Sequence, residues 1–321
     1  MKHMAMLVVG MVVACSSAVP TESNQATLCD EAGAHESGAG APAVVEQATI
    51  GGEAGQAASV EAGAAGAGGE AGALATGGEA GAGPELPVIV LFVAGQSNAE
   101  GMSTDSVPGG VPDATIPEFQ FSFGKAKALQ QEAFLSVAPA FDGTLSHELC
   151  AAKALQAAGR RVAVIKITHG GTYISQWDPT GPGVPYVKKF ELAVSLLAKE
   201  FPSGTAFDFR WVWDQGENEA KLGDPEVTAA WPGRLAALRA AFEGVAKQPL
   251  DPYIVITWSP RYKKASMDAV RAVQTSIASP GHAIDSYGSA FGADMIHRTG
   301  AADCLIGQAY AEKILESGPW N

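Results

Sequence analysis

The feature that most constrains the fold is an unbroken apolar run, residues 88–94, which ends at Gly95 and is followed at once by polar residues. A run of this length that is rich in β-branched residues is typical of a strand buried on both faces, as strands are in parallel sheets. Ligands of such sheets bind beyond the carboxyl ends of the strands, which is where Gln96, Ser97 and Asn98 would lie. Ser97 is therefore either a turn residue or a nucleophile, and a nucleophile needs partners from further along the chain.

Helix and strand patterns alternate along the rest of the chain. Residues 87–321 are therefore interpreted as one α/β domain, a three-layer sandwich in which a mainly parallel central sheet lies between helices. Residues 102–142, with Pro108, Pro112 and Pro117, are interpreted as a long irregular insertion beside a substrate cleft. The expected strands are residues 87–94, 161–168, 207–213, 252–258 and 286–289, and the expected helices are residues 146–158, 186–201, 226–247 (continuous through Pro232), 267–277 and 301–316.

The N-terminus has the pattern of a secretion signal over residues 1–14. Lys2 and His3 precede an apolar core, residues 4–13, that is too short to span a bilayer. The residues that end at Cys15 look like a bacterial lipobox, in which the cysteine becomes the lipidated mature N-terminus. The alternative is an ordinary signal peptide followed by an incidental cysteine. Both interpretations predict an extracytoplasmic protein, either a lipoprotein held at the cell envelope by its lipid alone or a secreted protein.

Residues 15–86 are predicted to be a disordered tether. They consist mainly of Ala, Gly and Glu, and Gly-Gly-Glu-Ala-Gly recurs at 51–55, 68–72 and 77–81. So little apolar bulk cannot offset the entropy of ordering the backbone. This segment holds ten acidic side chains and no Lys or Arg, whereas residues 87–321 hold 20 basic against 24 acidic side chains. The formal charge of −13 therefore belongs mainly to the tether, and no region is basic enough to bind nucleic acid.

The globular part contains two cysteines, Cys150 and Cys304. An oxidising compartment permits a disulfide between them, but their spacing leaves a disulfide and two buried free thiols equally open. No Cys-x-x-Cys pair or His/Cys cluster indicates a metal site, and neither a metal nor an organic cofactor is expected.

An aspartate and a histidine three residues apart, Asp294 and His297, lie just before the last expected helix. Residues at this spacing face the same way in a first helical turn. The carboxylate can therefore hydrogen-bond the imidazole, fix its tautomer and stabilise the cation that forms on proton transfer. The other ring nitrogen would then face Ser97. Taken alone, the pair is equally compatible with surface or helix-capping residues.

Polar residues also follow the second and third expected strands. His-Gly-Gly-Thr at 169–172 follows the second strand. Paired glycines let a main-chain N–H approach a ligand closely, as an oxyanion donor must, although a tight turn explains them equally well. Gln215 follows the third strand, where its side-chain amide is placed to supply another oxyanion donor. Glu217 is interpreted as a carboxylate that orients this loop rather than as an acid–base group.

Together these motifs resemble the SGNH hydrolase superfamily, specifically the branch that holds sialate O-acetylesterases and the acetylxylan esterases of carbohydrate esterase family six. The matching elements occur in the family's order and span residues 87–321. They are Gly-Gln-Ser-Asn at 95–98 with Gly101, His-Gly-Gly-Thr at 169–172 with Trp177, Trp-Asp-Gln-Gly-Glu at 213–217, and Asp-x-x-His at 294–297 with Gly300 and Gly307.

The resemblance implies a role for each matching residue. Ser97 corresponds to the nucleophile, His297 to the general base and Asp294 to the acid that orients the base. The implied oxyanion donors are the N–H of Ser97, the N–H of Gly170 or Gly171, and the side-chain amide of Gln215. The residues expected to contact the substrate are Gln96, Asn98, His169 and Trp177. Glu217 is expected to hold these residues without contacting the substrate itself.

The chain departs from the family pattern at two places. Arg298 follows His297 where relatives often have proline, which would tilt the histidine loop, and Asn218-Glu219 stands where a small residue and aspartate are more usual. Neither departure removes a catalytic group. The sequence therefore predicts a serine esterase that removes O-acetyl groups from extracellular carbohydrate, of the acetylxylan or sialic-acid type, through an acyl-serine intermediate. The alternatives are an esterase for small acyl esters and a catalytically silent cell-surface carbohydrate-binding protein on the same fold.

Overall fold

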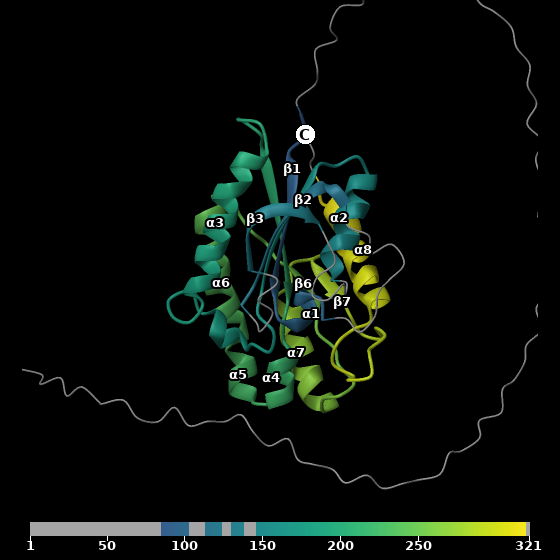
Figure 1. Cartoon of the computed structure of the whole chain (residues 1–321). Helices are drawn as coiled ribbons and strands as arrows, with labels where there is room; N and C mark the ends of the chain where they lie inside the picture. The colour runs from purple at the N-terminus through teal and green to yellow at the C-terminus, as the bar shows by residue number, and fades with distance from the viewer. Residues whose placement is uncertain (1–84, 103–112, 124–129, 138–145, 319–321) are drawn as a thin grey trace, which may run out of the picture. The chain divides into compact units, whose positions relative to one another are not determined.

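The structure of the protein is a computed structural model that describes residues 85–102, 113–123, 130–137 and 146–318 (Figure 1). All of them belong to one compact unit, residues 74–321. Within these ranges no helix is both long and apolar enough to cross a membrane. The signal peptide expected at 1–14, the lipidation of Cys15 and most of the tether expected at 15–86 lie outside the described residues and stay predictions.

A seven-stranded sheet forms the centre of this unit, in the order β3-β2-β4-β1-β5-β6-β7. Neighbouring strands are parallel except β2 and β3, which are antiparallel. The predicted α/β fold with a mainly parallel sheet is thus confirmed. The strands are β1 (Val88–Gly95), β2 (Asp113–Ser122), β3 (Gln130–Val137), β4 (Val162–Thr168), β5 (Phe207–Asp214), β6 (Tyr253–Ile256) and β7 (Ala283–Asp285).

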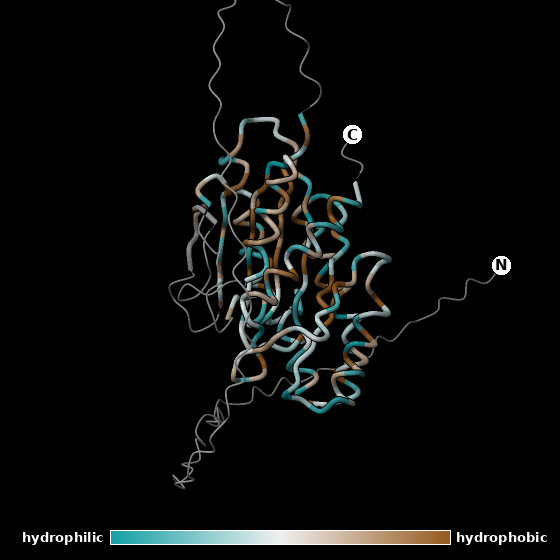
Figure 2. The backbone as a smooth tube through the Cα atoms, turned by 90° about the vertical axis from the view of Figure 1, so that its right-hand side faces the viewer, coloured by the Kyte–Doolittle hydropathy of each residue, from teal (hydrophilic) through white to brown (hydrophobic). Residues whose placement is uncertain are grey.

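Helices cover both faces of the sheet. They are α1 (Ser97–Glu100), α2 (His147–Ala157), η3 (Ile174–Trp177), α3 (Val184–Glu200), α4 (Glu217–Leu222), α5 (Pro225–Ala229), α6 (Trp231–Ala246), α7 (Lys264–Ile277) and α8 (Gly300–Glu316). Alternate residues of β1 enter different cores: Val90 and Phe92 pack in the cluster that contains α3 and α6, whereas Leu91 and Val93 pack in the cluster that contains α2 and α8. Figure 1 shows these two helix pairs on opposite sides of the sheet, and Figure 2 shows hydrophobic backbone segments gathered in the middle of the domain.

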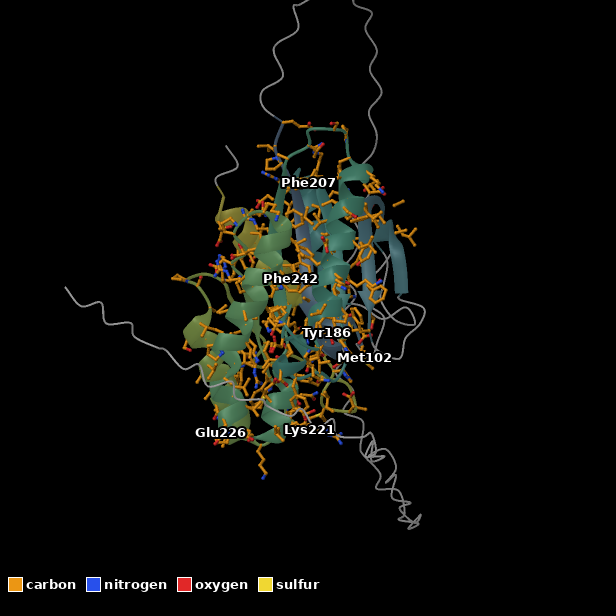
Figure 3. All side chains as sticks on the ribbon, turned by 90° about the vertical axis from the view of Figure 1, so that its left-hand side faces the viewer. Met102, Tyr186, Phe207, Lys221, Glu226 and Phe242 are labelled. Carbon is orange, nitrogen blue, oxygen red and sulfur yellow. A yellow bond between two sulfur atoms is a disulfide. The ribbon has the colours of Figure 1, made fainter. Side chains whose placement is uncertain are left out.

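The strand register brings the carboxyl ends of three strands together. Gly95 of β1 pairs with Thr168 of β4 on one side and with Asp214 of β5 on the other. The residues that follow each strand therefore meet at one edge, beside β1, where the strand order changes direction and α/β sheets bind ligands. In Figure 3 this end of the sheet lies toward the labelled Met102 and Tyr186, away from Phe207 at the start of β5.

The structure corrects the prediction in three places. The supposed irregular insertion at 102–142 contains β2 and β3; Pro117, which suggested a loop, lies at a register shift where the missing N–H is tolerated. The helix predicted at 226–247 is two helices, because α5 ends at Ala229 and α6 begins anew with Pro232 in its first turn. The last strand covers residues 283–285 and not 286–289.

A disulfide between Cys150 and Cys304 joins α2 and α8. It decides between the two states that the sequence left open. The same two helices cross closely at Gly307, where a Cβ would lie 2.0 Å from the carbonyl oxygen of His147. Glycine is therefore required at this crossing, which positions α8 and the loop before it that carries His297.

Candidate active site

The turn that carries Ser97 is formed by a close approach of β1 and β5. Gly95 has a φ of +153°, and a Cβ there would lie 2.0 Å from the carbonyl oxygen of Asp214. The N–H of Gln96 donates to that same carbonyl at 3.0 Å. The chain then enters α1 with Ser97 as its first residue, and its N–H has no partner within the helix because it lies in the first turn.

A buried carboxylate holds the residues on both sides of Ser97. The side-chain amide of Gln96 donates to one oxygen of Glu217 and that of Asn98 donates to the other at 2.5 Å. All three side chains are buried. Glu217 therefore supports the nucleophile turn, and the buried side chains of Gln96 and Asn98 connect that turn to it. Their predicted contact with substrate is not supported, because both side chains are buried and their amide nitrogens donate to Glu217.

The electrostatics of Glu217 are unusual for a carboxylate. Burial, and then the negative charge of Asp214, raise its pKa to about 7, although the Arg298 cation and the hydrogen bond from Asn98 oppose the rise. Both the protonated and the ionised form of Glu217 are therefore populated near neutral pH. Such a raised pKa is common where a carboxyl is buried at a functional site.

The predicted aspartate–histidine pair is formed. Asp294 Oδ2 lies 2.5 Å from His297 Nδ1, while Oδ1 accepts the main-chain N–H groups of Ile296 at 2.9 Å and His297 at 3.0 Å. Burial raises the pKa of Asp294, but these hydrogen bonds outweigh it and the pKa is lowered. The carboxylate thus assigns the proton to Nδ1 and leaves Nε2 of His297 as the basic nitrogen.

Asn98 connects this pair to the nucleophile turn. Its Oδ1 accepts the N–H of Arg298 at 3.2 Å and its Nδ2 donates to the carbonyl of Ile296 at 3.4 Å. Asn98, the residue after Ser97, is therefore hydrogen-bonded to both neighbours of His297. These bonds join the nucleophile turn to the histidine loop. The Ser97 hydroxyl itself has no hydrogen bond within the described chain, and catalytic hydrogen bonds are often long in unliganded enzymes.

The histidine loop has a strained backbone. Met295 has a φ of +59°, a left-handed conformation that a non-glycine residue rarely adopts. Its N–H donates to the carbonyl of Gly292 at 3.0 Å, and its own carbonyl accepts the hydroxyl of Ser259 at 2.7 Å. Strain of this kind persists only where surrounding contacts over-determine it, as they do beside many active sites.

The two candidate oxyanion glycines differ in their surroundings. A Cβ on Gly170 would lie 3.8 Å from Cβ of Ser97 and 2.8 Å from Oε2 of Glu100, so this glycine lies against the nucleophile. Gly171 has a φ of +73° and a Cβ there would meet open space, while its carbonyl accepts the side-chain amide of Asn218. The geometry therefore favours Gly170 over Gly171 as the donor beside Ser97.

Gln215 does not act as an oxyanion donor in this structure, which corrects the prediction. Both hydrogens of its buried amide are used, one on the carbonyl of Thr172 at 3.1 Å and one on Glu219 at 2.5 Å. Its Oε1 accepts the indole N–H of Trp231 at 3.0 Å. Gln215 instead ties the loop after β5 to the segment that carries Gly170.

The two remaining predicted substrate contacts separate. Trp177 is fully buried, donates its indole N–H to Thr172 Oγ1 at 2.9 Å and stacks on Tyr186, so its predicted contact with substrate is wrong. His169 is half-buried and its Nδ1 lies 2.6 Å from the Tyr186 hydroxyl. Burial lowers the pKa of His169 and raises that of Tyr186 to about 12. The tyrosine therefore donates to Nδ1, and the neutral imidazole keeps a hydrogen on Nε2 for a ligand.

Sequence reasoning missed the buried charges beneath the site. Arg298 is fully buried and its guanidinium pairs with Asp214 and with Asp303, at 2.7 Å for the latter. It was expected to tilt the histidine loop, but these pairs hold it in place. A second buried ion pair joins Lys166 and Glu148 at 2.7 Å. Among the described residues no cluster of His, Cys, Asp or Glu is arranged to hold a metal ion.

A serine at a strand end, a histidine oriented by an aspartate and a glycine against that serine are the groups that serine hydrolases use. Asn98, beside the serine, is hydrogen-bonded to the residues on both sides of the histidine. The profile of the family described as carbohydrate esterase, sialic acid-specific acetylesterase, matches residues 87–316. The chain belongs to this family and is therefore an ester hydrolase, which confirms the resemblance drawn from its motifs. A search of curated protein sequences gives no significant match.

Solved structures resemble this chain in fold. A protein from Arabidopsis thaliana is 17% identical with a TM-score of 0.56, and the match covers 72% of this chain and 99% of that chain. A carbohydrate acetylesterase from Sinorhizobium meliloti is 14% identical with a TM-score of 0.42, covering 71% and 98%. One from Xanthomonas citri is 17% identical with a TM-score of 0.44, covering 70% and 55%. The first of these supports the fold assignment.

Proposed function

We propose that the protein is a serine esterase that removes O-acetyl groups from extracellular carbohydrate through an acyl-serine intermediate. The observation that carries the proposal is Asn98, which follows Ser97 and is bonded to the residues on both sides of His297. Membership of the carbohydrate esterase family supports the substrate class. No metal or organic cofactor is needed for this chemistry.

The first half of the reaction forms the acyl-enzyme. Nε2 of His297 takes the proton of the Ser97 hydroxyl as Oγ attacks the ester carbonyl carbon. The tetrahedral oxyanion accepts the N–H groups of Ser97 and Gly170. The bond from carbon to the sugar oxygen then breaks, and that oxygen leaves with the proton from His297. Asp294 holds the imidazolium throughout this sequence, at 2.5 Å from Nδ1.

The second half releases acetate. Water donates a proton to Nε2 of His297 and attacks the acetyl-serine carbonyl, and the ester bond to Ser97 Oγ breaks as the proton returns to the serine. His169 directly follows β4, and its Nε2 hydrogen is proposed to contact the substrate, because Tyr186 occupies Nδ1.

The test compares hydrolysis of aryl acetate, acetylated xylan, acetylated pectin and O-acetyl sialic acid by the wild-type protein and three variants. Ser97→Ala and His297→Ala are expected to abolish hydrolysis with unchanged circular dichroism. Ser276→Ala, an exposed serine on α7, is the matched control and keeps full activity. Full activity in Ser97→Ala would refute the nucleophile. Turnover of aryl acetate with none of the sugar acetates would favour the esterase of small acyl esters.

We further propose that the protein is extracytoplasmic and held at the cell envelope by a lipid on Cys15. The signal-like residues 1–14 and the lipobox-like sequence support this proposal. Metabolic labelling with a fatty acid is expected to label the wild-type protein and not Cys15→Ser, which would be secreted. Equal labelling of both would contradict it.

A further inference from the structure

Arg298 is a fully buried cation directly beside the proposed catalytic base. Its Nε donates to Asp303 at 2.7 Å, its Nη2 donates to Asp214, and its main-chain N–H donates to Asn98 at 3.2 Å. Two carboxylates and the residue after the nucleophile therefore converge on the residue after His297.

The partners of Arg298 come from three separate elements. Asp214 ends β5, and its carbonyl accepts the N–H of Gln96 in the nucleophile turn at 3.0 Å. Asp303 lies in the first turn of α8, next to the disulfide-bonded Cys304. Arg298 thus connects the sheet edge, the last helix and the turn that carries Ser97.

Few other contacts tie the tip of the histidine loop to the domain. The main-chain bonds from Gly292 to His297 and from Met295 to Gly292 stay inside the loop. From outside the loop, among the described residues, Ser259 donates to the carbonyl of Met295 at 2.7 Å, the exposed Arg261 donates to the carbonyl of Asp294 at 3.1 Å, and Asn98 donates to the carbonyl of Ile296 at 3.4 Å. The pairs of Arg298 join opposite charges and are fully buried, so they are stronger than the neutral bond from Ser259 and the solvent-exposed bond from Arg261.

We propose that Arg298 is a positioning residue that sets the distance between Nε2 of His297 and the Ser97 hydroxyl. The inference rests on the proposed function and goes beyond it, because it assigns a role to a residue that touches neither substrate nor reacting atoms. A planar guanidinium that pairs with two carboxylates restrains the main chain of its own residue. Because His297 directly precedes Arg298, the position of His297 is restrained as well.

The charge of Arg298 has a second consequence. Its positive charge lowers the pKa of Glu217, whose carboxylate holds Gln96 and Asn98. The charged and titratable groups that act on Glu217 from the elements around it are Asp214 at the end of β5, Arg298 before α8 and Tyr262 before α7. Removing this fixed cation favours the protonated form of Glu217, whose carboxylate holds the nucleophile turn. The fall in kcat on the acid side of its pH profile (the acid limb) therefore moves to higher pH.

Arg298→Met and Arg298→Lys test the proposal together. Displacing a catalytic group by about 1 Å costs on the order of 100-fold, so kcat of Arg298→Met on aryl acetate falls by about 100-fold with KM nearly unchanged. Its acid limb shifts upward. Arg298→Lys retains the charge but cannot grip both carboxylates, so its kcat falls while its acid limb stays in place.

Arg239→Met is the matched control. Arg239 also joins two carboxylates, Glu243 at 2.8 Å and Asp251 at 2.9 Å, but it lies on α6. Its loss changes kcat by no more than about twofold, as for other surface substitutions. A kcat for Arg298→Met equal to that of Arg239→Met would overturn the proposal, and so would a loss of kcat with an unmoved acid limb, which would make Arg298 purely structural.

Two further measurements separate a loss of positioning from unfolding of the variant and from failure of the proposed function. Removing one partner of a buried ion pair leaves uncompensated charge and can unfold the protein. The combined change Arg298→Met, Asp214→Asn and Asp303→Asn removes that imbalance; it is expected to restore the melting temperature but not kcat, and restored kcat would overturn the proposal. A wild-type protein that neither hydrolyses aryl acetate nor reacts with a serine-directed phosphonate would instead refute the proposed function.

Discussion

The ionisation of Glu217 offers a quantitative test of how the nucleophile turn is held. Burial and Asp214 raise its pKa from the usual 4.5 to about 7. Each pKa unit corresponds to about 1.4 kcal/mol, so keeping this carboxylate ionised costs the folded state about 3 kcal/mol. A group with a higher pKa in the folded state binds its proton more tightly there, so its stabilising contribution is complete below the unfolded-state pKa and is lost as the pH rises through the folded-state pKa.

Glu217→Gln removes this titration. The measurement is urea unfolding of the wild type and the variant at a series of pH values. The free energy of unfolding of the wild type minus that of the variant is expected to fall by about 3 kcal/mol between pH 4.5 and about pH 8. Glu226→Gln, an exposed side chain at the start of α5, controls for the loss of one acidic residue.

The same variant tests the hydrogen bonds of the turn. A glutamine at 217 offers one acceptor oxygen, so one of the Gln96 and Asn98 amides is left facing another donor, at a cost of about 1–3 kcal/mol. The nucleophile turn loosens and kcat falls. A free-energy difference that does not change with pH would refute the assignment of a buried, ionising carboxylate at this position.

Three further variants address the remaining parts of the site. Asp294→Asn should lower kcat by about 10,000-fold, because the amide stabilises the wrong tautomer; steady-state kinetics with aryl acetate measures this, and a loss below about tenfold would exclude Asp294 as the orienting acid. Gly170→Ala places a Cβ 2.8 Å from Glu100 Oε2; the displaced N–H should cost about 100- to 1,000-fold in kcat, whereas Gly244→Ala, at an exposed position of α6 where a Cβ meets open space, serves as the comparison, and equal losses would contradict the role of Gly170. Cys150→Ser with Cys304→Ser opens the link between α2 and α8 and should lower the free energy of unfolding by about 2–5 kcal/mol in chemical denaturation; an unchanged midpoint would contradict a stabilising disulfide.

Much of the fold could be predicted from the sequence because the pattern of apolar residues follows the buried faces. The run at 88–94 is uniformly apolar because alternate residues of β1 enter two different cores. β2 escaped prediction for the opposite reason. It contains buried polar side chains, Glu118, Gln120 and Ser122, and Pro117 resembles a loop residue. A polar strand is recognisable only once its neighbours are known.

The catalytic arrangement could be predicted because its residues follow strand ends and because Asp294 and His297 are close in sequence. Which polar side chains remain free could not. Gln96 and Asn98 have the right chemistry to contact a ligand, but both donate to Glu217, a buried carboxylate more than a hundred residues later in the chain. Gln215 has the same chemistry, but its amide donates to the nearby Glu219 and to the carbonyl of Thr172, 43 residues earlier. The pairing of Arg298 with Asp214, 84 residues earlier, likewise depends on the fold and leaves no local signal.

The central claim is that Ser97 becomes acylated, and trapping the intermediate tests it most directly. The protein is mixed with excess aryl acetate, quenched in acid within the first turnovers, digested and examined by peptide mass spectrometry. An acetyl group is expected on the peptide that contains Ser97, with labelling lost in His297→Ala and retained in Ser276→Ala. An acetyl group on another residue, or turnover without an acetylated Ser97 peptide, would contradict the account.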